Sequence, residues 1–279
     1  MLEDALSRRL FDDAIVLKIV GYRRAYYPPE AFDAYLKVIG EPQAFTHPNL
    51  PNSYMGMPLH IFEVQKNEPA KIIATLGLVD SINLYRQYFV ERDGINFAPQ
   101  HGEIVLDCGA CVGEIAAIFA MHVGEAGQVH LFDPMPAHVA FCNQQKMLNP
   151  HLANRMHVVP MAVGAHSNQK EPLLAATTEI QPSATTDASF PFIAIDDYVQ
   201  THNIRVDVIK MDIEGGEYDA LKGSENTLRK FQPRLMISAY HRPDDLWVLR
   251  ALIQQINPNY KFYFGHHTPI QWETVLYAV

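Results

Sequence analysis

Residues 105–116 read Val-Leu-Asp-Cys-Gly-Ala-Cys-Val-Gly-Glu-Ile-Ala, and this stretch decides the fold. Its apolar start predicts a buried strand that ends at Asp107. A turn with Gly109 and Gly113 follows, and a helix is predicted to begin near Glu114. Glycine backbone and the free N–H groups of a helix start can both approach a ligand closely. The stretch therefore predicts a cofactor site, although an ordinary strand–turn–helix, with glycines that serve only packing, is the alternative.

The spacing of these glycines favours a cationic ligand. A dinucleotide fingerprint, Gly-x-Gly-x-x-Gly, needs glycine where this chain has Asp107. A carboxylate there repels a pyrophosphate, whereas S-adenosylmethionine carries a sulfonium and an ammonium and no phosphate. The next predicted strand ends at Asp133, where a carboxylate can accept the ribose hydroxyls of an adenosine. We therefore expect S-adenosylmethionine as the cofactor rather than NAD.

Composition indicates a globular protein with a small partner. The chain has 279 residues, 48% of them hydrophobic, which suits one large domain or a domain with an extension. It has no apolar run of about 18 residues and no signal-peptide pattern at its start, so we expect no membrane span and a cytoplasmic location. The net charge of −9, without a cluster of Lys and Arg, argues against nucleic-acid binding.

The three cysteines do not indicate a disulfide framework. Cys108 and Cys111 form a Cys-x-x-Cys inside the glycine turn, and Cys142 stands apart. A redox or zinc site would need a thioredoxin-like context or a second pair of ligands. We expect all three to be reduced and the first two to be small residues of the cofactor loop.

From residue 103 onward the pattern alternates between strands and helices. This order is typical of a mostly parallel sheet with helices on both faces. The predicted strands are 103–107, 128–133, 155–159, 206–211, 234–239, 260–265 and 273–279, and the last two are close enough to pair antiparallel. The predicted helices begin near Glu114, Pro136, Ile195, Gly216 and Pro243. Ligands of such sheets bind beyond the carboxyl ends of the strands, where Asp107, Asp133 and Asp212 lie.

The first 85 residues differ from the rest. Helical spacing is found over 2–21 and 29–39, a loop is predicted over 41–58, and short strands over 60–64 and 71–76. We predict that residues 1–85 form a mainly helical extension, which either caps the pocket or makes a homodimer contact; simple packing of its amphipathic helices on the core domain is the default alternative. A second long loop is predicted over 175–189, as a lid or as a solvated segment.

A second motif surrounds the fourth predicted strand. Residues 210–223 read Lys-Met-Asp-Ile-Glu-Gly-Gly-Glu-Tyr-Asp-Ala-Leu-Lys-Gly and bring Lys210, Asp212, Glu214 and Glu217 to one strand end. The dipole of the following helix explains Glu214 and Glu217 without any catalytic role. It explains Lys210 and Asp212 less well, because they follow an apolar strand.

This run resembles the hallmark of the FkbM family of S-adenosylmethionine-dependent methyltransferases. Further pieces resemble that family at 105–113, 132–134, 160–165, 193–198 and 233–241, and the resemblance covers roughly 86–279. The chain departs from the usual pattern at Cys108, Cys111 and Gly216, and none of these changes removes a charged contact. The resemblance implies a class I methyltransferase fold, an α/β Rossmann-like sheet of seven strands with the last one antiparallel. It also implies methylation of a hydroxyl on a sugar, a polyketide or another secondary metabolite.

The expected site follows from both motifs and the resemblance. The expected cofactor-binding residues are Asp107, Gly109, Ala110, Gly113, Glu114, Asp133, Pro134, Ala162 and Asp212. The expected catalytic residues are Asp212, His241, Glu214 and Lys210. His138, His266 and His267 are expected to be surface or structural residues.

An aliphatic hydroxyl must lose its proton as the methyl group is transferred, either to a general base or with the help of a metal. His241 follows the fifth strand and is a candidate base near neutral pH, although capping of a helix start is an equal alternative. Asp212, Glu214 and His241 could instead hold Mg²⁺. N- or carboxyl-methylation of a similar acceptor and a non-catalytic, methyltransferase-like subunit remain as alternative functions.

Overall fold

The computed structural model describes seven stretches of the chain. They are residues 2–20, 42–65, 68–76, 86–168, 170–172, 189–267 and 273–279. The helix expected over 29–39 and the loop expected over 175–189, except its last residue, lie outside the described residues. None of the described helices combines the length and the apolar character needed to cross a membrane.

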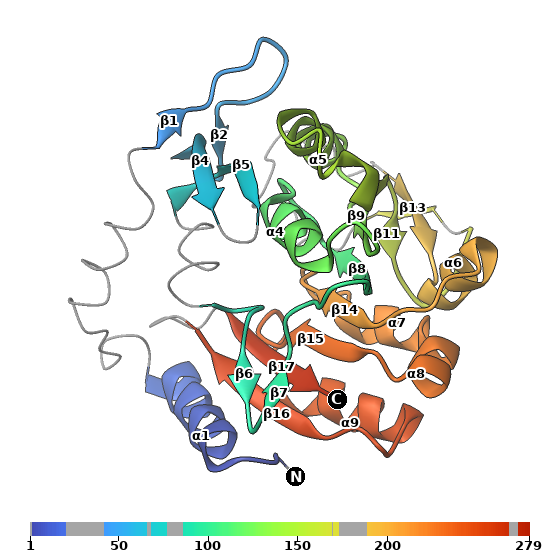
Figure 1. The fold of residues 1–279 in the computed structure, drawn as a ribbon. Helices are drawn as coiled ribbons and strands as arrows, with labels where there is room; N and C mark the ends of the chain where they lie inside the picture. The colour runs from blue at the N-terminus through green and yellow to red at the C-terminus, as the bar shows by residue number, and fades with distance from the viewer. Residues whose placement is uncertain are drawn as a thin grey trace.

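A seven-stranded sheet forms the centre of the molecule (Figure 1). Its strands are β8 (Ile104–Cys108), β9 (Gln128–Phe132), β10 (Met156–Val159), β14 (Val208–Met211), β15 (Arg234–Ser238), β16 (Phe262–His266) and β17 (Thr274–Ala278). They lie in the order β10-β9-β8-β14-β15-β17-β16, and β17 is antiparallel to both of its neighbours. All seven predicted strands are confirmed, and this arrangement is that of a class I methyltransferase.

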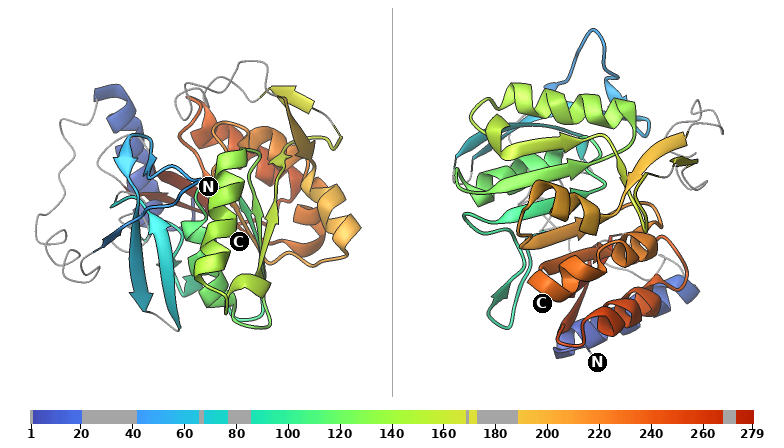
Figure 2. Two further views of the ribbon diagram at one scale, coloured as in Figure 1. Left: turned by 90° about the horizontal axis from the view of Figure 1, so that it is seen from above. Right: turned by 90° about the vertical axis from the view of Figure 1, so that its right-hand side faces the viewer.

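Helices cover both faces of this sheet (Figure 2) because successive strand residues point to opposite sides. On β8, Val105 packs in the core under α4, and Leu106 packs in the core on the other face. The helices are α4 (Glu114–Val123), α5 (Pro136–Leu148), α6 (Ile195–His202), α7 (Glu217–Lys222), α8 (Glu225–Phe231) and α9 (Asp245–Ile256). The five predicted helix starts are confirmed to within two residues. Sequence reasoning missed α8, which follows α7 after a short break at Gly223 and Ser224.

A small sheet follows β10. It consists of β11 (Ala162–Val163), β12 (Lys170–Pro172) and β13 (Ser189–Ile193), with β13 in the middle. A short 3-10 helix, η2 (Ala153–Arg155), precedes β10. Strands β11 and β12, of two and three residues, are too short to produce a readable alternation, so the sequence did not indicate the partners of β13.

The first helix covers the edge of the large sheet. Helix α1 (Ala5–Val20) lies beside β16, and the Ser7 hydroxyl accepts a hydrogen bond from the backbone N–H of Phe264 at 2.8 Å. The ring of Phe11 packs edge-on against the ring of Phe264, with centroids 5.4 Å apart. The helix expected over 2–21 is therefore confirmed, and it contacts the methyltransferase sheet directly.

Strands dominate the described residues from 42 to 74. They are β1 (Gln43–Ala44), β2 (Ser53–Tyr54), β3 (Met57–Pro58), β4 (His60–Gln65) and β5 (Pro69–Ala74). Strands β1, β4 and β5 form an antiparallel sheet, and β2 and β3 form a hairpin. A second hairpin follows, with β6 (Glu91–Arg92) and β7 (Ile95–Asn96). The two short strands predicted in this region are confirmed as β4 and β5.

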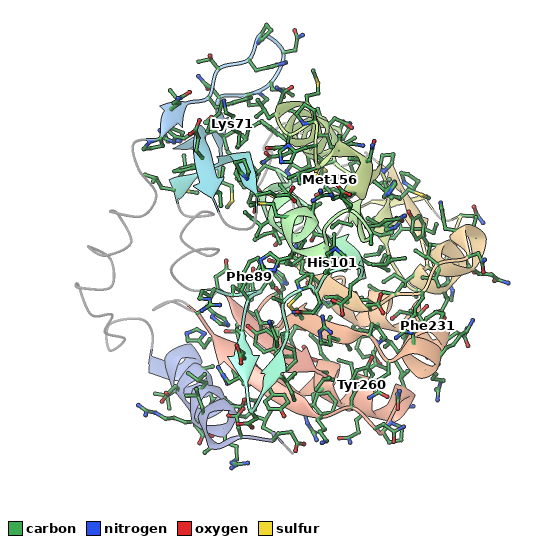
Figure 3. All side chains as sticks on the ribbon, in the orientation of Figure 1. Lys71, Phe89, His101, Met156, Phe231 and Tyr260 are labelled. Carbon is green, nitrogen blue, oxygen red and sulfur yellow. The ribbon has the colours of Figure 1, made fainter. Side chains whose placement is uncertain are left out.

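Two side-chain amides, Gln145 in α5 and Asn149 directly after it, bind this sheet to the large domain. The Gln145 amide donates to the carbonyl of Ile73 at 2.7 Å and accepts from its N–H at 3.1 Å. The Asn149 amide makes the same pair of bonds to the backbone of Lys71, both at 2.8 Å (Figure 3 labels Lys71). The two amides thus replace a neighbouring strand along the edge of β5, which fixes the N-terminal sheet beside α5.

Candidate active site

The loop between β8 and α4 is held tightly against the end of β14. Gly109 has φ +83°, and a Cβ atom built on it would lie 1.8 Å from the backbone oxygen of Asp212. Gly113 has φ +82°, and its Cβ would lie 3.2 Å from Cys142. Both positions therefore require glycine because of conformation and close packing. Close packing against Asp212 is therefore enough to explain Gly109, and it does not exclude a ligand on the other side of the loop.

A buried ion pair joins the two central strands. Asp107 is fully buried at the end of β8, and the ammonium of Lys210 on β14 lies 3.0 Å from its Oδ1. The same ammonium donates a hydrogen bond to the carbonyl of Gly109 at 2.7 Å. Burial raises the pKa of Asp107, against the opposing effect of Lys210. The structure thus places Lys210, an expected catalytic residue, under the cofactor loop as the counter-ion of Asp107.

Two carboxylate oxygens at this strand end fit a cationic ligand. Oδ2 of Asp107 and Oε2 of Glu114 are buried, and within the described ranges neither accepts a hydrogen bond. Burial raises the pKa of Glu114 to about 7. A buried acceptor without a donor is costly, so a ligand that supplies N–H donors and positive charge is favoured here. The ammonium of S-adenosylmethionine has both properties.

Asp133 follows β9, as the ribose-binding prediction requires. Its Oδ2 accepts the N–H of Cys111 at 3.0 Å, and its Oδ1 accepts the N–H of Met135 at 2.9 Å. His138 was expected to be a surface or structural residue; it is buried rather than on the surface, and its Nδ1 lies 3.0 and 3.1 Å from the two oxygens of Asp133. Of the other expected residues, Ala110 is buried in the loop, Pro134 directly follows Asp133, and Ala162 lies in β11.

Asp212 directly follows β14 and lies between two tyrosines that sequence reasoning missed. The hydroxyl of Tyr88 donates to its Oδ2 and that of Tyr240 to its Oδ1, both at 3.1 Å. Burial, followed by the charge of Asp212, raises the pKa of both tyrosines well above its ordinary value. Both hydroxyls therefore stay protonated and act as donors. Tyr240 directly precedes His241, and this adjacency was the one available signal; nothing near Tyr88 in the sequence indicates the contact.

His241 follows β15 and lies among three carboxylates. Its Nδ1 is 2.9 Å from Oε1 of Glu217, and its Nε2 is 3.4 Å from Oδ1 of Asp212 and 3.6 Å from Oε2 of Glu214. Burial lowers the pKa of His241, but Glu217, Asp212 and Glu214 outweigh burial and raise it to about 9. The structure therefore brings together three of the four expected catalytic residues, Asp212, Glu214 and His241. Glu217 lies on the Nδ1 side of the imidazole, opposite the two other acids.

The backbone after β14 explains how these acids converge. Glu214 has φ +56° and Gly215 has φ +94°, so the chain turns sharply before α7. Glu217, which is completely buried at the first position of α7, accepts the N–H of Ile213 at 2.8 Å. This bond fixes the Glu217 carboxylate under the turn, where it meets His241.

A further acid, Glu273, directly precedes β17 and borders the site. Glu273 has φ +58° and its carboxylate is hydrogen-bonded by the Gln87 amide. Burial, followed by the charge of Asp212, raises the pKa of Glu273 to about 7. Gln87 and Glu273 are far apart in the sequence and belong to no motif, which is why the sequence did not indicate them.

The remaining predicted histidines and the cysteines take structural places. His266, which ends β16, contacts the hydroxyl of Thr274, and the next residue, His267, contacts the hydroxyl of Tyr277; both hydroxyls belong to β17. The three cysteines are free, as expected. Burial raises the pKa of the Cys108 thiol, and the Cys111 thiol is affected in the same way, so neither forms a thiolate readily.

Comparison with known proteins agrees with this geometry. A family model described as the methyltransferase FkbM domain matches residues 107–269, from the acid that ends β8 to the connection after β16. The chain belongs to the FkbM methyltransferase family. The match includes the first motif from Asp107 onward, the whole second motif, every expected cofactor-binding residue and all four expected catalytic residues. The FkbM model leaves the domain boundary that we predict between residues 85 and 86 untested.

A solved structure of an FkbM methyltransferase shows the same fold. The methyltransferase FkbM from Methylobacillus flagellatus KT is 29% identical, with a TM-score of 0.56 over 70% of this chain and 48% of that chain. This FkbM chain thus spans about half the length of that protein. Two fibrillarins are more distant. Fibrillarin from Methanococcus jannaschii is 11% identical, with a TM-score of 0.47 over 80% of this chain and 89% of that chain. Fibrillarin from Aeropyrum pernix, with natively bound S-adenosyl-L-methionine, is 12% identical, with a TM-score of 0.44 over 86% of this chain and 98% of that chain. No curated protein matches the chain in sequence.

Proposed function

We propose that the protein is an S-adenosylmethionine-dependent O-methyltransferase that acts on a hydroxyl of a small molecule such as a sugar, a polyketide or another secondary metabolite. The family supports methyl transfer. The observation that supports oxygen as the acceptor is the contact of His241 with the buried Glu217, because a hydroxyl needs a proton acceptor and an amine or a carboxylate does not. Asp212 lies 3.4 Å from Nε2, the other nitrogen of the same imidazole.

The residues at the strand ends fit the cofactor. Asp107 and Glu114 would face its ammonium, and Asp133 its ribose, as the free acceptors of the first two and the position of the third suggest. When bound, the cofactor would supply an electrophilic methyl group on a sulfonium. The buried acids at this edge would favour that positive charge over a phosphate.

His241 is proposed to take the proton of the acceptor hydroxyl. A carboxylate can only accept, so Glu217 requires the proton of a neutral imidazole to be on Nδ1, which leaves Nε2 as the basic nitrogen. With a pKa raised to about 9, His241 is a cation at neutral pH in the free protein. A cationic ligand among the same carboxylates opposes this charge, so binding favours the neutral imidazole that can accept a proton.

A divalent cation such as Mg²⁺ is the second candidate for activating the hydroxyl. Oxygens of Asp212 and Glu214 lie 3.4 and 3.6 Å from Nε2 of His241, beyond hydrogen-bond distance but near the spacing of atoms that share one ion. Asp212, Glu217 and His241 also form a group that could hold a metal. In that case a chelator should abolish turnover and added Mg²⁺ should restore it, whereas a protein base would be indifferent to the chelator.

Calorimetric titration with S-adenosylhomocysteine, with NAD⁺ in parallel, tests the proposal first. Binding of the homocysteine product alone supports the methyltransferase pocket and leads to an acceptor screen with a labelled methyl donor. A folded sample that binds neither compound would favour the non-catalytic alternative. In the screen, His241→Ala should abolish methylation of a hydroxyl. Little loss in that variant would instead favour an amine or a carboxylate acceptor.

A further inference from the structure

The carboxylate of Asp133 already has a complete set of donors. Two backbone N–H groups, from Cys111 and Met135, bind one oxygen each. Nδ1 of His138 lies 3.0 and 3.1 Å from the two oxygens and therefore sits between them. A carboxylate offers about four lone-pair sites, two on each oxygen. The two backbone groups use one lone-pair site on each oxygen. Nδ1 of His138 faces the remaining site on each oxygen.

We propose that His138 occupies the face of Asp133 that a ribose diol requires, so that His138 must turn away before the adenosine part of the cofactor binds. The inference rests on the proposed function. Two adjacent ribose hydroxyls each donate one hydrogen bond, and they need one free site on each carboxylate oxygen. Because Asp133 accepts only, Nδ1 of His138 carries a proton and competes directly with the diol.

Tyr54 holds His138 in this position. Its ring packs edge-on against the imidazole, with centroids 5.7 Å apart and planes 61° apart. Burial, followed by the neighbouring Cys111 thiol, raises the pKa of the Tyr54 hydroxyl, and the backbone N–H of the same Cys111 binds Asp133. Tyr54 belongs to the hairpin of β2 and β3, outside the residues that the family model matches. The N-terminal segment therefore contributes a residue of its own to the cofactor site.

Binding of S-adenosylhomocysteine and of adenosine to His138 variants tests this arrangement by calorimetry and stopped-flow mixing. His138→Ala removes the competing donor, so both ligands should bind up to about tenfold tighter and associate faster, the scale of one hydrogen bond. His138→Asn keeps a donor near the position of Nδ1 and should stay close to the wild type. His138→Leu fills the space without a donor and serves if the alanine variant does not fold.

Tyr54 variants test how His138 is held. Tyr54→Ala should raise the association rate in the wild-type background and should add nothing in the His138→Ala background, because the two residues act in series. Met55→Ala, on the same hairpin but half exposed, is the matched control and should change neither rate nor affinity. Each variant's thermal unfolding reports whether the fold is intact.

The outcomes separate this inference from the proposed function. Weaker ligand binding in His138→Ala, or equal binding in all His138 variants, would show that His138 orients Asp133 or is neutral, and would overturn the inference while leaving the methyltransferase pocket in place. A folded wild-type protein that binds neither S-adenosylhomocysteine nor adenosine would overturn the proposed function itself.

Discussion

The ammonium of Lys210 lies 3.0 Å from Oδ1 of Asp107 and donates a hydrogen bond to the carbonyl of Gly109 at 2.7 Å. The two residues are direct partners in the register of β14 and β8. One buried cation therefore neutralises the acid that ends β8 and also fixes the loop that follows it. This arrangement makes the charge of Lys210 a condition for the shape of the cofactor loop.

We expect Lys210→Met to lower the free energy of unfolding by about 3 to 5 kcal/mol, because it leaves Asp107 buried without a counter-ion. Urea unfolding followed by circular dichroism measures the change. Lys261→Met, at an exposed position, is the control. A loss below about 1 kcal/mol, the range of exposed ion pairs, would show that the pair is not needed for folding.

Gly109→Ala should be far more harmful than Gly94→Ala. Both glycines have positive φ, +83° and +76°, but a Cβ on Gly94 would meet nothing within 4 Å, whereas one on Gly109 would overlap the Asp212 carbonyl. We expect a loss of about 1 kcal/mol for Gly94→Ala from backbone strain alone. For Gly109→Ala we expect about 3 kcal/mol or more because overpacking adds to that strain. Similar melting temperatures for the two variants would contradict the close approach of the loop and β14.

Glu217→Gln should reduce kcat by about 100-fold and leave the affinity for S-adenosylhomocysteine unchanged, because it removes the charge that orients His241. The labelled-methyl assay, with the acceptor that the screen identifies, gives kcat, and calorimetry gives the affinity. Glu225→Gln, half-exposed on α8, is the control. Full turnover in Glu217→Gln would remove the orienting role from Glu217.

The stability of the protein should fall in acid because of His130. Burial, then the charges of His157 and His202, lower the pKa of His130 to about 4, below its unfolded value of 6.5. Between these values the unfolded chain binds a proton that the folded protein does not. The stability from the neutral imidazole is therefore complete above pH 6.5 and is lost as the pH falls to 4, by about 3 kcal/mol at most.

Urea unfolding at pH 7, 5.5 and 4.5 checks this dependence. Acidic groups titrate in the same range, so the wild type must be compared with His130→Gln. The variant should lose less free energy of unfolding than the wild type as the pH falls. His166→Gln, at an exposed position, should follow the wild type. Parallel curves for the wild type and His130→Gln would mean that His130 titrates equally in both states.

The amides on α5 give a last prediction. Gln145→Leu leaves the N–H and the carbonyl of Ile73 without their partner, so we expect a loss of about 1 to 3 kcal/mol and faster hydrogen exchange over β4 and β5. Gln144→Leu, one residue earlier and half-buried, should leave the exchange of these strands unchanged. Equal exchange in both variants would show that hydrophobic contacts alone hold the N-terminal sheet.

The sequence predicted the large sheet well because each of its strands is a buried apolar run of readable length, and the acids at the strand ends marked the site. It could not indicate contacts that depend on packing between distant segments. Tyr88 reaches Asp212 across 124 positions, and Gln87 reaches Glu273 across 186. His138 lies only five residues after Asp133, but an imidazole in the first turn of a helix can adopt several orientations. Tertiary packing selects the one that contacts Asp133.

Helix α1 has a consequence for how the chain matures. The hydrogen bond that the Ser7 hydroxyl accepts from the backbone N–H of Phe264 joins residues 257 positions apart, and β16 is itself held in the sheet by β17. When the ribosome releases residues 5–20, the surface that they will cover does not yet exist. This helix is therefore translated long before the strand that it packs against, and its apolar side must stay shielded, or bind a chaperone, until translation has passed residue 278.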